Sequence, residues 1–304
     1  MSEISASLVK QLREQTGAGM MECKKALVQA NGNLDEAIVV LRKAGLASAA
    51  KKATRVTKQG TIVARSADAG QSGVLLEVNC ESDFVARTDD FLALTAKLAD
   101  TIATAPASIV GAADPVAALL SSALDGATVE DAIKATIAKL GENISVARYT
   151  RFKAAAGVVG SYIHPGAQLG VLIEIATPLA DASGNAEIQE LVKDVAMQIA
   201  AADPKFLGRE DVTPDAIAKE KDIQKARVIA EGKPEKVAEK IVEGRMGKFY
   251  EEICLLEQPF IKEGSITVAE LVKSKAKALG ADVQISRYAR FKVGETAPAE
   301  AAAE

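Results

Sequence analysis

Apolar residues recur at helical spacing through the first 45 residues of the chain. Ile4 and Leu12 lie eight residues apart with another leucine midway between them, as expected for one face of an α-helix. A glycine-containing break at 16–19 and an Asn-Gly pair at 31–32 divide this segment, and Gly45 ends its periodic pattern. The pattern predicts three short helices in a small bundle, whose exposed apolar edge would be a natural docking surface.

Two longer segments of the chain repeat one pattern. The segment GTIVARS at 60–66 aligns with GVVGSYI at 157–163, an offset of 97 residues. Further on, LGENISVARYTRFK at 140–153 aligns with LGADVQISRYARFK at 279–292, an offset of 139 residues, with seven of fourteen positions identical. Each copy reads as strand, strand, helix, helix, strand. The repeat therefore predicts an α+β fold with a three-stranded antiparallel sheet, covered by helices on one face, present twice.

The second copy contains an insertion between its two helices, because the offset grows by 139 minus 97, or 42, residues. Within 211–257, Thr213-Pro214 opens a helix in the preferred order of cap and then proline. The sequence Gly232-Lys233-Pro234 breaks that helix and precedes a second one. A narrow apolar seam between charged faces predicts a protruding antiparallel helical hairpin.

The remaining segments have no periodic apolar face. ASAAKKATRVTK at 47–58 is basic and rich in small residues, so it reads either as a linker or as the solvated end of a helix. The expected units in chain order are a three-helix domain at 1–46, a linker at 47–59, a first core repeat at 60–153, a second core repeat at 154–292 with the hairpin inside it, and a disordered tail at 293–304.

Composition and charge exclude several classes of function. The net charge of −4 and the pI near 5.4 provide no chain-wide field that would attract nucleic acid. Three scattered cysteines, a single histidine and no phosphate-binding loop indicate no metal site, no nucleotide site, no cofactor and no catalytic cluster. Because neither a signal peptide nor a membrane-spanning stretch is present, we expect a soluble cytoplasmic protein.

One turn differs between the two copies. CESDFVAR at 80–87 aligns without a gap with TPLADASG at 177–184, so the fold can make this turn without Asp83 and Phe84. Phe84 therefore either packs inward as a hydrophobic staple on the next helix, or stands exposed as an aromatic anchor for a partner.

Three segments resemble the elongation factor Ts family, the bacterial guanine-nucleotide exchange factors for elongation factor Tu. They are TGAGMMECKKAL at 16–27, EVNCESDFVAR at 77–87 and EGRMGKFYEEICLLEQPF at 243–260. The resemblance extends over about residues 1–292 and implies a ubiquitin-associated-like N-terminal domain, a duplicated core and a coiled-coil hairpin. It also implies a protein that is not an enzyme and binds elongation factor Tu, both GDP-bound and nucleotide-free. Such a protein promotes GDP release so that GTP can load, and binds neither nucleotide, nucleic acid nor membrane itself.

The resemblance also assigns contact residues. The residues that would wedge the partner's nucleotide domain and disturb its Mg²⁺ are Ser82, Asp83, Phe84 and Val85. The residues that would dock the N-terminal domain are Lys10, Leu12, Arg13, Met20 and Met21. Further contacts of the core would be Leu140, Gly141, His164 and Ile261. Many family members have Thr where this chain has Ser82, and the short Ala/Glu-rich C-terminus leaves open whether that segment contacts the partner.

Two other functions remain open at this point. A nucleic-acid-binding translation protein would use the basic segment with Lys51, Lys52, Arg55 and Lys58 together with the repeated R-Y-x-R-F-K strands, although the net acidity argues against it. A metabolic enzyme is disfavoured by the missing catalytic cluster. The role of the hairpin and any higher assembly with the partner are not determined by the sequence.

Overall fold

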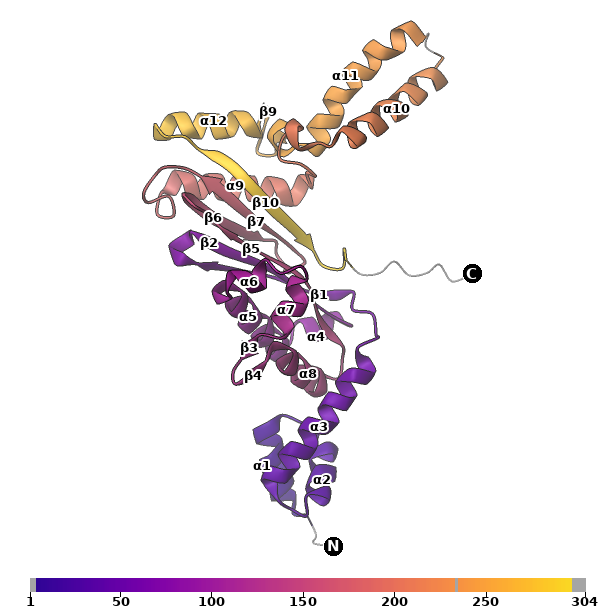
Figure 1. The fold of residues 1–304 in the computed structure, drawn as a ribbon, viewed down its shortest axis with the longest axis vertical. Coiled ribbons are helices and arrows are strands. Elements are labelled where there is room, and N and C mark those ends of the chain that lie inside the picture. The colour runs from indigo at the N-terminus through magenta and orange to yellow at the C-terminus, as the bar shows by residue number, and fades with distance from the viewer. Residues whose placement is uncertain (1–3, 233–234, 297–304) are drawn as a thin grey trace.

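The computed structural model describes residues 4–232 and 235–296, which form a mixed α+β structure (Figure 1). The α+β class predicted from the repeats is confirmed. The N-terminal helices are α1 (Ala6–Thr16), α2 (Met20–Gln29) and α3 (Leu34–Lys52). The first repeat contains β1 (Gln59–Ala67), η1 (Asp68–Gly70), β2 (Ser72–Cys80), α4 (Asp83–Ala86), α5 (Asp89–Thr104), α6 (Ala107–Val110), α7 (Pro115–Leu120), β3 (Ala123–Leu124), β4 (Ala127–Thr128), α8 (Val129–Leu140) and β5 (Ile144–Lys153).

The second repeat follows the same order with the insertion inside it. Its elements are β6 (Gly157–Ile163), β7 (Leu169–Ala176), α9 (Ala186–Ala202), η2 (Arg209–Asp211), α10 (Pro214–Ala230), α11 (Glu235–Ile253), η3 (Leu255–Glu257), β8 (Pro259–Phe260), β9 (Glu263–Thr267), α12 (Val268–Leu279) and β10 (Gln284–Lys292).

The third helix does not end at Gly45, where the sequence pattern stops, but continues to Lys52. A Cβ atom on Gly45 would lie 2.9 Å from the Cβ of Ala138 on α8. This glycine therefore lets two helices pack closely instead of stopping one of them. Residues 47–52 of the expected linker are accordingly helical, which is the alternative reading of that segment, and 53–58 connect α3 to β1.

Each repeat contains a three-stranded antiparallel sheet. The strand order is β1-β2-β5 in the first sheet and β10-β7-β6 in the second. Both sheets bulge at the same place: Ala147 on β5 and Ser286 on β10 are the extra residues, and their numbers differ by 286 minus 147, or 139. Because a bulge is a local irregularity, its repetition shows that the two units share one backbone plan.

Helices cover the outer face of each sheet, and the two inner faces pack against each other (Figure 1). A Cβ on Gly73 would lie 2.7 Å from Val159 Cγ1, and one on Gly170, its counterpart 97 residues later, would lie 2.6 Å from Ile62 Cγ2. The other buried members of this inner layer are Leu75, Phe152, Ala154 and Leu172. As a result β2 is buried along its whole length, and its last residue, Cys80, leads directly into the turn that differs between the copies.

Helices α10 and α11 form a hairpin that projects from the second repeat (Figure 1). Val228 on α10 packs against Val242 and Met246 on α11 in a narrow buried seam. The predicted break between the two helices falls partly on residues 233–234, which lie outside the described residues.

The C-terminal segment predicted to be disordered from residue 293 is bound to the core where it begins. The Gly294 N–H donates to the Glu77 carboxylate at 2.9 Å, and Arg148 donates to the Glu295 carboxylate at 3.0 Å. Residues 297–304 of the predicted tail lie outside the described residues.

Candidate functional site: a braced aromatic turn

In the turn after β2, the Val85 side chain is buried and the neighbouring Phe84 side chain is exposed. Ser82 caps the single-turn helix α4, because its Oγ accepts a hydrogen bond from the Val85 N–H at 3.4 Å. Val85 and Ala86 face the core of the first repeat, where both are buried. Phe84, between Asp83 and Val85, is 81% exposed. The staple alternative for Phe84 is therefore wrong, and the ring stands in solvent.

Two carboxylates tie this turn to the loop between α8 and β5. Glu142 accepts hydrogen bonds from the Ser82 N–H at 2.9 Å and from the Ser82 Oγ–H at 2.6 Å. In the opposite direction, Glu81 accepts the Asn143 N–H at 2.6 Å and lies 3.4 Å from the Arg55 guanidinium. Hydrogen bonds to a charged partner are the stronger kind, so two segments that are 60 residues apart in sequence are joined firmly.

Asp83 makes a weaker contact. It forms an ion pair with Arg87 one helical turn later at 3.0 Å, and both side chains are at least half exposed. An exposed pair of this kind contributes about 0–1 kcal/mol to stability. The Asp83 carboxylate can therefore exchange Arg87 for a partner group with little loss.

The proposed core contacts are divided between two places. Gly141 ends α8 in a left-handed conformation with φ 84°, so Leu140 and Gly141 lie immediately before Glu142 and beside the braced turn. His164 and Ile261 belong instead to the second repeat. His164 follows β6 and is hydrogen-bonded through Nδ1 to the Tyr162 hydroxyl at 3.0 Å, while Ile261 is half exposed between β8 and β9.

The proposed N-terminal docking residues also fall into two groups. Met20 and Met21, at the start of α2, are 56% and 65% exposed, so neither belongs to the small core. Lys10 and Arg13 are exposed on α1. Leu12 is fully buried in the core of the three helices. Its assignment as a docking residue is therefore not supported, because its side chain fills that core and does not reach the surface.

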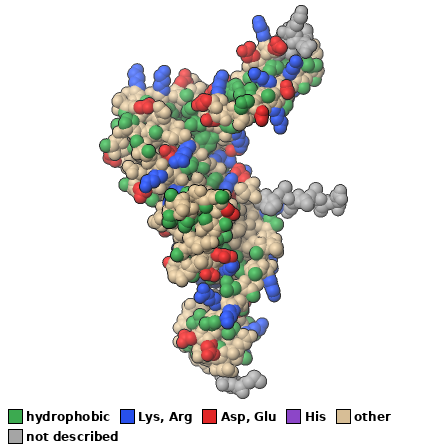
Figure 2. Space-filling view, in the orientation of Figure 1, with side chains coloured by type: hydrophobic (Ala, Val, Ile, Leu, Met, Phe, Trp, Pro, Cys, Tyr) green, Lys and Arg blue, Asp and Glu red, His purple; other side chains and the backbone are tan. Residues whose placement is uncertain are grey.

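The arginines of the repeated R-Y-x-R-F-K strands are engaged within the fold. Arg148 pairs with the buried Glu77 at 2.7 Å, and Arg151 donates to main-chain carbonyls at the end of α5, including that of Ala105 at 2.6 Å. Their equivalents behave alike: Arg287 pairs with Glu174 at 2.7 Å, and Arg290 lies 3.2 Å from Asp203 after α9. On the face shown in Figure 2, basic and acidic side chains are interspersed. The strand arginines thus support the protein's own structure, which removes one of the two features on which the nucleic-acid alternative rests.

The thiol nearest the turn is structural. Burial, followed by the nearby Glu142 carboxylate, raises the pKa of Cys80 to about 12, and its Sγ–H donates to the Ser82 carbonyl at 3.1 Å. A thiol with so high a pKa is a poor nucleophile at neutral pH. Over residues 4–232 and 235–296, no group of three or more His, Cys, Asp or Glu side chains is arranged to hold a metal ion. No helix in the same ranges is long and apolar enough to cross a membrane.

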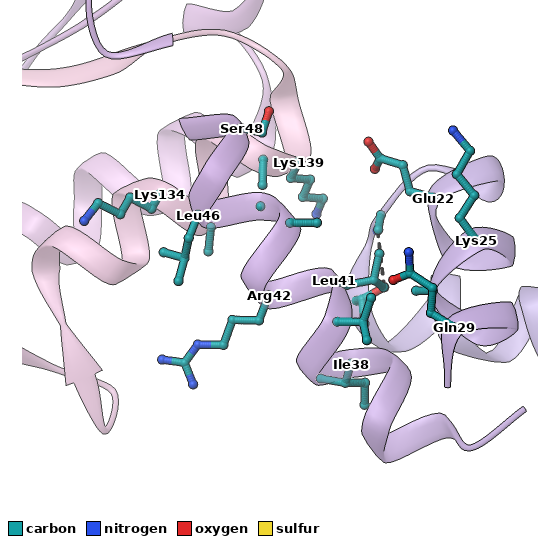
Figure 3. A pocket seen from close by; sticks show the side chains of 18 of the residues that line it. Glu22, Lys25, Gln29, Ile38, Leu41, Arg42, Leu46, Ser48, Lys134 and Lys139 are labelled. Atoms are coloured by element: carbon teal, nitrogen blue, oxygen red, sulfur yellow. Dashed lines mark hydrogen bonds between the residues drawn. The ribbon is translucent and has the colours of Figure 1, made fainter. Parts of the chain in front are cut away.

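A hollow of about 380 Å³ lies between the N-terminal helices and α8, beside the point where α3 packs against α8 (Figure 3). Its lining includes Ile38, Leu41 and Leu46 from α3, with Arg42 on the same helix and Lys134 on α8. Helix α3 also packs against α8 at Gly45, and the Asn143 side chain donates to the Arg55 carbonyl at 2.8 Å, so the N-terminal helices are joined to the segment that holds the braced turn.

Glu81 and Glu142 were not identified from the sequence as residues of this site. Both are ordinary surface acids in the sequence, and only the fold places them across the turn. The signal that could have found Glu142 is the comparison of the copies, because Ala281 occupies the equivalent position 139 residues later.

An exposed aromatic ring on a braced turn is the kind of feature that anchors binding between proteins. Sequence comparison identifies the family. The family model described as Elongation factor TS matches residues 81–295. Relatives named Elongation factor Ts include one from Clostridium botulinum (strain Eklund 17B / Type B), 45% identical over 96% of this chain and 93% of its own length.

Two further relatives with that name cover the chain equally well. The one from Solibacter usitatus (strain Ellin6076) is 45% identical over 100% of this chain and 98% of its own length. The one from Prosthecochloris aestuarii (strain DSM 271 / SK 413) is 44% identical over 97% of this chain and 100% of its own length. The chain therefore belongs to the elongation factor Ts family. Members of this family are nucleotide exchange factors for elongation factor Tu in translation elongation and are not catalytic enzymes, and this chain is one of them.

Proposed function

We propose that the chain releases GDP from elongation factor Tu by inserting Phe84 between two helices of the partner's nucleotide domain. The observation that carries this proposal is the exposed Phe84 ring on a turn that is hydrogen-bonded on both sides. The insertion disturbs the Mg²⁺ that bridges the nucleotide phosphates. Because this ion offsets much of the phosphate charge, moving its ligands weakens nucleotide binding.

The free energy for this step comes from burying the ring. Full burial of a phenylalanine side chain contributes about 1.5–3 kcal/mol, and a turn that is already held in place loses little further conformational entropy on binding. Coupling between two ligands is reciprocal, so bound nucleotide weakens the grip of the factor as much as the factor weakens the grip on nucleotide. The factor thus binds both the GDP-bound and the nucleotide-free partner, and nucleotide concentrations decide what loads next.

The N-terminal helices, a ubiquitin-associated-like domain in this proposal, form a second contact with the same partner. Met20 and Met21 supply adjacent flexible side chains at its surface, and Lys10 and Arg13 supply charge. The remaining contacts are Ser82, Asp83 and Val85 at the turn and Leu140, Gly141, His164 and Ile261 on the core. Val85 is buried, so its part is to anchor the turn. The exchange reaction takes place in the cytoplasm, without nucleic acid, membrane or a cofactor on the factor's side.

Release of labelled GDP from elongation factor Tu, measured against factor concentration, tests the proposal. The parent chain is expected to accelerate release by several orders of magnitude at saturation, and Phe84→Ala to lose most of that acceleration. Leu92→Ala is the matched control, since Leu92 is another exposed apolar residue of the first repeat, on α5, and its loss should leave the rate unchanged. A Phe84→Ala protein that remains bound and exchanges nucleotide at the parental rate would contradict the wedge.

Met20→Ala tests the second contact separately. It should raise the concentration needed for half-maximal exchange several-fold and leave the maximal rate nearly unchanged, because it removes binding that is the same before and during release. Unchanged half-saturation would place the docking surface elsewhere on the N-terminal helices.

A further inference from the structure

We propose that Glu142 is a positioning residue for the Phe84 wedge, which rests on the function proposed above. Its carboxylate receives both the N–H and the Oγ–H of Ser82, at 2.9 and 2.6 Å. Ser82 is the residue that caps α4, so Glu142 holds the cap of the helix that carries Phe84. It contacts no part of the partner in this scheme and acts only through the turn.

Comparison of the two repeats shows that the fold does not require the contact between Glu142 and Ser82. In the second copy the position of Glu142 is occupied by Ala281, and the position of Ser82 by Leu179. The second copy still joins helix α12 to strand β10 through a glycine with positive φ, as the first copy joins α8 to β5. The carboxylate and the serine that donates to it are therefore present only in the copy that also carries Asp83 and Phe84.

The physical need for a brace follows from the size of α4. This helix has four residues, and an isolated helix of that length is unstable because nucleation is unfavourable. Val85 secures its inner side, but the Phe84 ring is exposed and cannot secure the outer side. The double hydrogen bond to the Glu142 carboxylate is a strong restraint on the residue that caps α4, and we infer that it fixes the direction in which the ring leaves the surface.

The other end of the brace is rigid. Glu142 directly follows Gly141, the left-handed cap of α8. Helix α8 is fixed to the core by the buried Ile133 and Ile137, and Lys139 near its end pairs with Asp90 on α5 at 2.6 Å. The position of Phe84 is thus fixed relative to α5 and α8, which pack on the first sheet.

Exchange kinetics with Glu142→Ala provide the first test. The maximal rate of labelled GDP release is expected to fall about tenfold, whereas the concentration for half-maximal exchange should change less than about threefold, because the N-terminal contact is intact. Glu142→Gln retains an acceptor for the Ser82 N–H and should recover most of the rate. Glu130→Ala removes an exposed acid at the other end of α8, paired with Lys134 at 2.6 Å, and should behave as the parent.

A tryptophan at position 84 supplies a readout that a merely structural role would not move. The chain contains no Trp, so Phe84→Trp places a single fluorophore on the wedge. Adding Glu142→Ala to that protein should lower the fluorescence anisotropy of Trp at 84 through faster local motion. Adding Glu130→Ala to the same background should leave it unchanged.

The outcomes distinguish this proposal from the function on which it rests. If the parent accelerates GDP release and Phe84→Ala does not, while Glu142→Ala matches the parent in rate and anisotropy, the positioning role is refuted and the wedge stands. If Glu142→Ala changes only half-saturation, Glu142 is a binding contact and the positioning role is again refuted. If the parent fails to accelerate release, the proposed function itself is wrong.

Discussion

Phe84 and Phe91 are seven residues apart and have opposite environments. Phe91 is fully buried in the core of the first repeat, and Phe84 is the most exposed of the large apolar side chains in the described part of the chain. Burial of the first ring therefore contributes to folding, while burial of the second is left for a partner. Phe91 thus serves stability, whereas Phe84 is available for binding.

This contrast predicts two different effects on stability. Phe84→Ala should change the free energy of unfolding by less than about 0.5 kcal/mol, because the ring is already in solvent. Phe91→Ala should lower it by about 3–5 kcal/mol, since it leaves a cavity in the core. Urea denaturation followed by circular dichroism measures both. A large loss for Phe84→Ala would mean that the ring packs against the protein in solution.

The buried thiol beside the turn makes stability depend on pH. The pKa of Cys80 is raised from 9.0 to about 12 in the folded chain, so between these values the folded state binds more protons than the unfolded state. Its contribution to stability is therefore fully present below about pH 9 and is lost as the pH rises towards 12. Cys80→Ala should weaken this alkaline decline in thermal melting experiments, and an identical decline would assign it to other groups.

At the scale of elements, two helical glycines serve different purposes. Gly45 in α3 lets that helix approach α8, where a Cβ would lie 2.9 Å from Ala138. A Cβ on Gly244 in α11 would meet no heavy atom of the described residues within 4 Å, and the φ of Gly244 is not positive. The first glycine is required by a neighbouring element, and the second only adds flexibility to its own helix.

The substitution of alanine should therefore have opposite effects at these two positions. Gly244→Ala should stabilise α11 by about 0.5–1 kcal/mol through the helix preference of alanine. Gly45→Ala should destabilise the contact between α3 and α8 by about 1–3 kcal/mol because of overpacking. Amide hydrogen exchange in α3 and α11 reports each change locally. If amide exchange in α3 became slower in Gly45→Ala, the predicted overpacking against α8 would be wrong.

At the scale of the whole molecule, the two repeats are joined by reciprocal contacts across their sheets. Arg148 of the first repeat pairs with the buried Glu77 and lies over the ring of Phe291 in the second, 4.3 Å from its centroid. Arg287 of the second repeat pairs with Glu174, and it lies over Phe152 of the first at 4.4 Å. Each cation is thus shared by an acid of its own repeat and an aromatic ring of the other.

Removal of one such cation is predicted to be costly. Arg148→Met leaves the fully buried Glu77 without its ion-pair partner and should lower the free energy of unfolding by about 3–5 kcal/mol. Arg65→Met breaks the exposed pair with Asp100 and should cost about 0–1 kcal/mol. Guanidinium denaturation compares the two proteins. Equal losses would show that the contact between the repeats adds nothing beyond an ordinary surface ion pair.

Much of this organisation could be predicted from the sequence, because it is written in local patterns. Periodic apolar positions and capping residues determine where a helix forms and which of its faces is apolar, and the two offsets revealed the repeat and the inserted hairpin. Asp83 and Phe84 could be singled out because the second copy makes the equivalent turn without them. None of these inferences requires knowledge of which segments meet in space.

Which side chains are covered, and which groups cover them, depends on the packing of distant segments. The burial of Leu12, the exposure of Phe84, the extension of α3 past Gly45 and the bonding of the strand arginines all depend on contacts with distant segments. The same holds for Glu142, which reaches Ser82 across 60 residues of chain. Local sequence patterns were enough to place the helices and strands and to single out Phe84. That Phe84 faces solvent, and that Ser82 and Glu142 hold its turn, follows from the packing of those elements, because burial and hydrogen bonding are set by neighbours in space.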